Sequence, residues 1–69
     1  MSPRDINAAV DRVRAEFMEM PGLRLTLPQA ARLMGLDQVT CNHVIGALEH
    51  GRFLRRTPAG LVARVEDAT

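Results

Sequence analysis

The sequence predicts an α+β fold, mainly α-helical with a small β-hairpin, in a single domain over residues 1–69. Three observations predict it. Apolar residues recur every three or four positions over residues 3–20, two shorter helical segments share residues 26–51, and two alternating segments lie within residues 52–65. The composition, 46% hydrophobic and 25% charged, is typical of a globular domain with a modest core.

The first helix is expected over residues 3–20, with Ser2 as its N-cap and Pro3 at its first position. Its continuous apolar seam consists of Ile6, Val10, Val13, Phe17 and Met20. One alternative is that this seam only covers the remaining helices. The other is that part of the first helix pairs with a second copy of the chain, because a small domain gains much by dimerising. The dimer interface would then comprise Ala9, Val13, Phe17 and Met18.

Residues 26–51 predict two helices that cross sharply at a short turn. Thr26 can cap the first of them, and Gln29 completes a capping box three residues later. Gly35 supplies the left-handed residue that ends this helix, and Leu36 is expected to pack back over it.

The second helix of this pair is expected from Asp37, its N-cap, to His50, with Gly51 ending it. Gly46 inside the helix costs stability relative to alanine, and close packing or a close phosphate would explain it. Packing is the favoured explanation. Residues at helical spacing form the half-buried stripe, namely Cys41, Val44, Ile45 and Leu48. The outward side carries short polar side chains with few acids.

Two short strands are expected within residues 52–65, separated by a turn at residues 57–60 in which Gly60 is left-handed. Phe53 and the Leu61 side of the hairpin should rest on the helices, because a hairpin of this size is unstable alone. Residues 23–25 alternate and predict a third, short strand at the edge of this hairpin. Residues 66–69 are expected to be a frayed tail.

The sequence also argues against several classes of function. Cys41 is the single cysteine, so no internal disulfide can form, and a reducing, cytoplasmic setting follows. Cys41 itself is interpreted as a small buried hydrophobe. His43 and His50 lie about 10 Å apart along a helix, too far to share a metal ion. No nucleophile–base set, phosphate loop or membrane-length apolar run is present. The chain is therefore expected to be a non-enzyme without metal, cofactor, small-molecule ligand or membrane partner.

The helix pair and hairpin together resemble a winged helix-turn-helix domain, of the kind found in small stand-alone bacterial transcriptional regulators. The resemblance covers roughly residues 24–65. It depends on the small residue Ala31, on Gly35 in the turn, and on the apolar residues Cys41 and Val44. It implies a wing of two or three strands, and it implies double-stranded DNA binding with the helix of residues 38–50 in the major groove.

The resemblance also implies which residues contact DNA. Base edges would be approached by Gln38, Val39, Asn42 and His43. Phosphates would be held by Thr26, Arg52, Arg55, Arg56 and Arg64. Arg55 and Arg56 are adjacent on a strand and point to opposite faces, so at most one of them is expected to make a direct wing contact.

The net charge of +1 is low for a DNA-binding protein. Residues 20–65 nevertheless carry six arginines against two acidic residues, so the positive charge is concentrated in the segment that resembles the DNA-binding motif. Winged helices also serve in protein–protein contacts. A protein-interaction or dimerisation module without DNA binding therefore stays open as the alternative.

Overall fold

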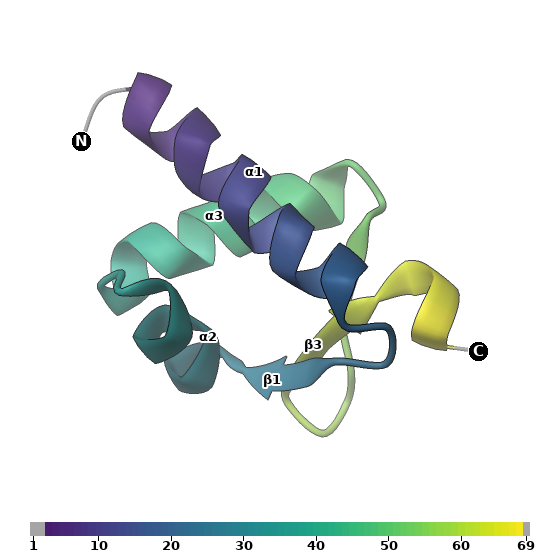
Figure 1. Ribbon diagram of the computed structural model, residues 1–69. Helices are drawn as coiled ribbons and strands as arrows, with labels where there is room; N and C mark the ends of the chain where they lie inside the picture. The colour runs from purple at the N-terminus through teal and green to yellow at the C-terminus, as the bar shows by residue number, and fades with distance from the viewer. Residues whose placement is uncertain (1–2, 69) are drawn as a thin grey trace.

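The computed structural model describes residues 3–68, which form three α-helices, a three-stranded antiparallel sheet and a closing 3-10 turn (Figure 1). The predicted α+β class is confirmed, and the layout is compatible with a winged helix. The expected N-cap Ser2 and the last residue, Thr69, lie outside the described residues.

Helix α1 spans Pro3–Glu19 and lies across α3, as Figure 1 shows. Its seam delivers Val13 and Phe17 into the core, where their side chains are 1% and 0% exposed. The chain then turns at Gly22, whose φ of 85° is readily adopted only by glycine.

Helix α2 spans Leu27–Met34, and its first turn has the predicted capping box. The Gln29 amide donates to the Thr26 hydroxyl oxygen at 3.2 Å, and the Thr26 amide donates to the Gln29 side chain at 2.9 Å. Gly35 has the expected left-handed backbone, with φ 67° and ψ 31°. The Leu36 amide donates back to the Ala31 carbonyl at 2.9 Å, which closes the helix end and aims the chain into the next helix.

Helix α3 spans Gln38–His50 and begins at the predicted cap Asp37. It ends at His50 with Gly51 as its C-cap, as predicted. Gly51 has φ −79°, and the left-handed residue is Arg52, with φ 61°. The Arg52 amide donates to the Glu49 carbonyl and the Phe53 amide to the Leu48 carbonyl, both at 2.9 Å, the paired bonds of a Schellman motif. An arginine therefore occupies the position at which glycine is favoured.

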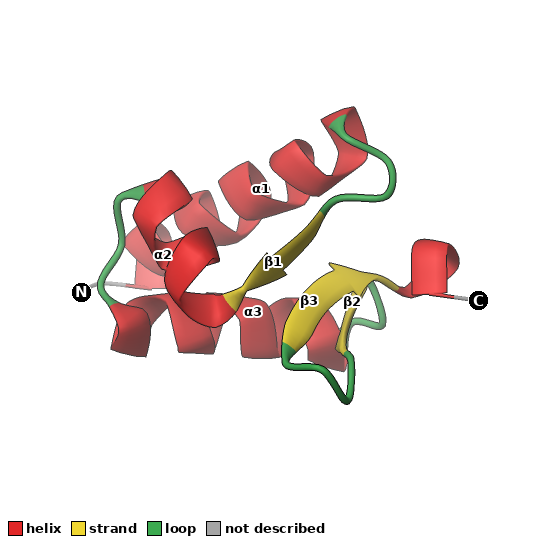
Figure 2. Ribbon diagram, turned by 90° about the horizontal axis from the view of Figure 1, so that it is seen from below, coloured by secondary structure: helices red, strands yellow, loops and turns green. Residues whose placement is uncertain are grey.

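The sheet contains β1 (Arg24–Thr26), β2 (Leu54–Arg56) and β3 (Leu61–Arg64) in the order β1-β3-β2, both pairings being antiparallel (Figure 2). The predicted third strand therefore joins the hairpin, along β3. Leu54 and Val62 lie on the face toward the helices and are almost fully buried. Leu61 pairs with Thr26 and lies on the other face, so its expected packing against the helices is wrong.

The last described residues, Val65–Ala68, form a 3-10 helix, whereas a frayed tail was expected. The Val65 amide donates to the Phe53 carbonyl at 3.0 Å, which ties this turn to the start of the hairpin.

The core lies between α1, α2 and α3 and extends to the sheet. Its residues are aliphatic apart from one aromatic ring and two sulfur-containing side chains: Val13, Phe17, Ala30, Ala31, Met34, Cys41, Val44, Ile45, Leu48, Leu54 and Val62. Among residues 3–68, no helix combines the length and the apolar character needed to cross a membrane.

Candidate nucleic-acid interface

The outward side of α3 carries three exposed polar residues and one exposed valine. Gln38, Val39, Asn42 and His43 are all exposed, Val39 to 71%. We call these four residues the α3 face. The opposite stripe, from Cys41 to Leu48, is buried against α1, α2 and β2, so α3 cannot turn this face inward. Figure 2 shows α3 along one edge of the molecule, and β2 packs against it.

The acid nearest the start of this face is turned back onto its own helix. Asp37 accepts from the Thr40 amide at 2.6 Å and from the Thr40 hydroxyl at 3.1 Å. The hydrogen bond from the Thr40 backbone, followed by that from the Thr40 side chain, lowers the pKa of Asp37. The carboxylate therefore stays ionised and is committed to the helix cap.

The single acid within α3, Glu49, is neutralised by the wing. The Arg56 Nε atom donates to the Glu49 Oε1 atom at 2.7 Å, and Arg56 Nη2 donates to the Asn42 Oδ1 atom at 2.7 Å. We call this three-residue cluster the Arg56 bridge. It joins β2 to the exposed face of α3. The sequence analysis did not predict this cluster. The available signal was an acid, Glu49, followed seven residues later by an arginine, Arg56, with the end of a helix between them.

The Arg56 bridge also orients Asn42. A guanidinium group has only N–H donors, so the side-chain oxygen of Asn42 must face Arg56 and its NH₂ group must point elsewhere. The NH₂ group is therefore presented as a hydrogen-bond donor, while Arg56 occupies one of the two lone pairs of the oxygen.

The remaining wing arginines differ in position. Arg52 and Arg55 are exposed. Arg55 pairs with Ala63, whereas Arg56 pairs with Val62, so the two side chains lie on opposite faces of the sheet, as predicted. The one that faces α3 is Arg56. On the other face, Ala63 of β3 lies between Arg55 of β2 and Arg24 of β1.

Arg64 was predicted to contact phosphate, but most of its side chain is covered by the protein. Its side chain is 18% exposed, and its Nη2 atom donates to Glu66 at 2.8 Å. Its guanidinium carbon lies 5.5 Å from the centroid of the Phe53 ring, as does that of Arg14. Arg64 is therefore engaged inside the fold, at the far end of the core-facing side of the sheet.

Thr26 offers less to a phosphate than predicted. The capping box already engages the amides of Thr26 and Gln29. Pro28 has no amide hydrogen. The donors of this turn that are left for a phosphate are therefore the Leu27 amide and the Thr26 hydroxyl hydrogen.

The predicted dimer interface is not one surface. Val13 and Phe17 are buried in the core of their own chain and have no surface for a partner. Ala9 is half-buried and Met18 is 54% exposed. These two residues are nine positions apart, which puts them on opposite sides of a helix with 3.6 residues per turn. No single flat contact can therefore include both.

Gly46 does not mediate close packing, contrary to the favoured explanation. A Cβ atom built on it meets no atom within 4 Å outside its own helix backbone. Gly46 lies about one helical turn after Asn42 and about two turns after Val39, both of which belong to the α3 face.

Gly46→Ala is therefore expected to stabilise the protein by about 1 kcal/mol, because alanine restricts the unfolded chain and favours helix. Urea unfolding followed by circular dichroism measures this difference. A loss of stability would contradict the open space around Gly46. Gly51→Ala is the matched control, because Gly51 lies after the last residue of α3 and a smaller gain in helix propensity is expected there.

The described residues hold no other apparent chemical centre. Cys41 is fully buried, and burial raises the pKa of its thiol, which disfavours the reactive thiolate. Residues 3–68 contain no group of three or more His, Cys, Asp or Glu side chains that could hold a metal ion. Comparisons of the chain with protein-family models, with curated proteins and with solved structures find no match.

Proposed function

We propose that this chain is a winged helix-turn-helix protein that binds double-stranded DNA, with α3 in the major groove, and acts as a small transcriptional regulator. The observation that carries the proposal is the Arg56 bridge. It removes the charge of the one acid within α3 and couples the wing to the α3 face. Such a protein would act in the cytoplasm, where Cys41 would stay reduced.

The α3 face supplies the groups that the major groove recognises. Gln38, Asn42 and His43 offer polar atoms to base edges, and Val39 offers an apolar surface to a thymine methyl group. Arg52 and Arg55 supply positive charge for phosphates. With Arg56 neutralised and Arg64 engaged within the fold, one copy makes few phosphate contacts, so weak and salt-sensitive binding is expected.

A fluorescence-polarisation titration of a random duplex at low salt tests the proposal, and we expect a Kd of about 10 to 100 µM. Arg52→Gly and Arg55→Gln are each expected to weaken binding to all duplexes and to lower the salt slope by about one. Arg52→Gly is also expected to stabilise the fold by about 0.5 to 1 kcal/mol, because glycine adopts the left-handed conformation without steric cost.

This combination separates binding from folding. A variant that is more stable yet binds more weakly cannot owe its defect to unfolding. Arg14→Gln is the matched control for charge, because Arg14 contacts Phe53 rather than the α3 face. Absence of duplex binding at the highest concentration tested would rule against the proposal.

A second candidate function is a protein-interaction module built on the same fold. The observation that favours it is that Arg56 and Arg64, two of the four arginines expected to hold phosphate, are paired with carboxylates. Val39 and Leu33, 71% and 49% exposed, would supply apolar contacts. Val39→Ser separates the two functions: an effect on a protein partner without any duplex binding by the wild type would favour this candidate.

A further inference from the structure

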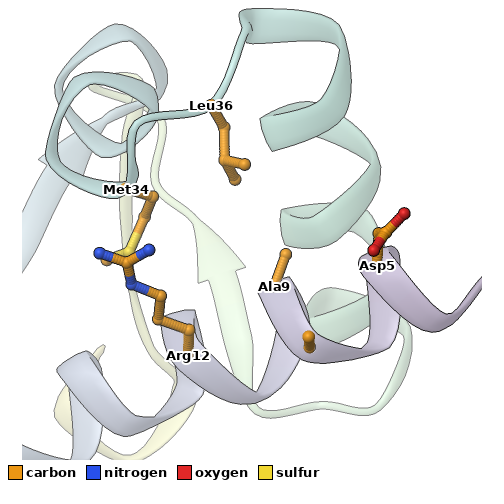
Figure 3. Close-up of a pocket in the computed structure, with 6 residues that line it drawn as sticks. Asp5, Ala9, Arg12, Met34 and Leu36 are labelled. Carbon is orange, nitrogen blue, oxygen red and sulfur yellow. The ribbon is translucent and has the colours of Figure 1, made fainter. Parts of the chain in front are cut away.

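A hollow of about 280 Å³ lies away from the α3 face, where α1 meets the end of α2 and the turn that follows it. It is lined by Asp5, Ala8, Ala9, Arg12, Met34 and Leu36. Figure 3 shows Asp5 and Arg12 at opposite ends with Ala9 between them, and Leu36 pointing toward α1. The lining is therefore small and apolar at its centre and oppositely charged at its two ends.

The four α1 residues of this hollow are arranged symmetrically about the point between Ala8 and Ala9. Three residues before Ala8 stands the acid Asp5, and three residues after Ala9 stands the base Arg12. Asp5 and Arg12 each lie three or four residues from both alanines and seven residues from each other, so the four side chains stay on one flank of the helix although Ala8 and Ala9 are adjacent. Val13 and Phe17 are not part of this flank, although Ala9, at its edge, also packs against the core.

Such an arrangement is complementary to itself. When two copies of α1 pack antiparallel about a twofold axis through this point, Asp5 of each copy faces Arg12 of the other, and Ala8 faces Ala9. The alanines let the two helix axes approach closely. Leu36 of each copy lies beside the contact and loses water-exposed apolar surface.

We propose that a second copy of this chain occupies the hollow, through a twofold contact of the N-terminal half of α1. The occupant is inferred from charge complementarity: the order acid, alanine, alanine, base is complementary to its own reverse, in which a base faces the acid and an acid faces the base. Asp5 can pair with Arg12 of the second copy and still keep its favourable position in the first turn of α1, because a carboxylate accepts several hydrogen bonds. The contact replaces the predicted interface of Ala9, Val13, Phe17 and Met18, of which only Ala9 is shared.

Sedimentation equilibrium without DNA tests this contact, so its outcome is independent of the proposed function. The wild type is expected to form dimers as its concentration rises from about 10 µM to about 1 mM. Asp5→Arg and Arg12→Asp each replace two attractions by two repulsions, and each alone is expected to weaken dimerisation by about tenfold or more.

The decisive sample is an equimolar mixture of the Asp5→Arg and Arg12→Asp chains. In a mixed pair, arginine again faces aspartate at both ends, so the mixture is expected to associate as the wild type does. Asp11→Arg and Arg4→Asp are the matched controls, since they make the same charge changes outside the hollow and should leave dimerisation unchanged. Ala8→Arg changes an exposed residue that the fold does not need and is expected to abolish association.

Any of four results would overturn the proposal. The wild type could stay monomeric over the whole range, either reversed chain could dimerise as well as the wild type, or the mixture could fail to regain association while circular dichroism reports folded chains. A folded Ala8→Arg protein that still dimerises normally would also overturn it.

Discussion

Phe17→Ala is expected to leave much of the protein unfolded at room temperature. Phe17 is fully buried and is the largest side chain of the core. Its truncation costs about 3–5 kcal/mol, from lost apolar burial and the cavity left behind. A chain of this size seldom has more than about 3–5 kcal/mol of stability in total. The substitution therefore removes most of what holds the domain together.

Urea unfolding of Phe17→Ala and of its neighbour Met18→Ala measures this effect. Met18 is 54% exposed, so its truncation should change the unfolding midpoint very little. The sequence also allowed Phe17 to lie in a dimer interface, and the same experiment distinguishes the two positions. Interface loss would change stability only at concentrations where dimers form, whereas core loss is expected at every concentration. A Phe17→Ala protein with the wild-type midpoint would contradict the core position.

Arg56→Ala is expected to change which base is preferred opposite Asn42. In the wild type the Asn42 oxygen accepts from Arg56, so its NH₂ group is left to donate. A donor alone matches the acceptors of guanine (N7 and O6) or thymine (O4), whereas the paired contact with adenine needs the amide oxygen as well. Removing Arg56 frees that oxygen, and preference at this position should move toward adenine by about 1–3 kcal/mol.

Selection from a random duplex pool, run in parallel with wild type and Arg56→Ala, measures the preference. Arg55→Ala is the matched control. Because Arg55 lies on the other face of the sheet, its loss should weaken binding to all sequences alike. Asn42→Ala should remove the preference altogether. A wild type that already selects adenine through Asn42, or a preference unmoved by Arg56→Ala, would contradict the donor-only orientation of this amide.

The local parts of the fold were predictable because their signals are local. Thr26 with Gln29, Gly35 with Leu36, and Asp37 each satisfy backbone groups within a few residues, so the limits of α2 and the start of α3 could be placed from the sequence. The end of α3 at His50, followed by Gly51, was also predicted. The sequence did not indicate that Arg52 would be the left-handed residue around which the Schellman bonds form.

The candidate site was less predictable because its contacts join distant segments. Strand alternation separates Arg55 from Arg56, but it does not determine which of them faces α3. That depends on how the hairpin returns along the helix, and only the structure brings Arg56 to Asn42 and Glu49. For the same reason the sequence did not distinguish Arg64 from the other arginines, whereas in the structure Arg64 pairs with Glu66 and lies over the Phe53 ring.

The strand order has a consequence for how this chain acquires its structure during synthesis. The central strand, β3, is the last to be made, and both β1 and β2 pair only with it. Helices can form early on the growing chain, but no strand ladder can exist until residues near the C-terminus have emerged from the ribosome. Until then Leu54 and the inner face of β1 lack the strand that covers them, so the sheet forms in one late step.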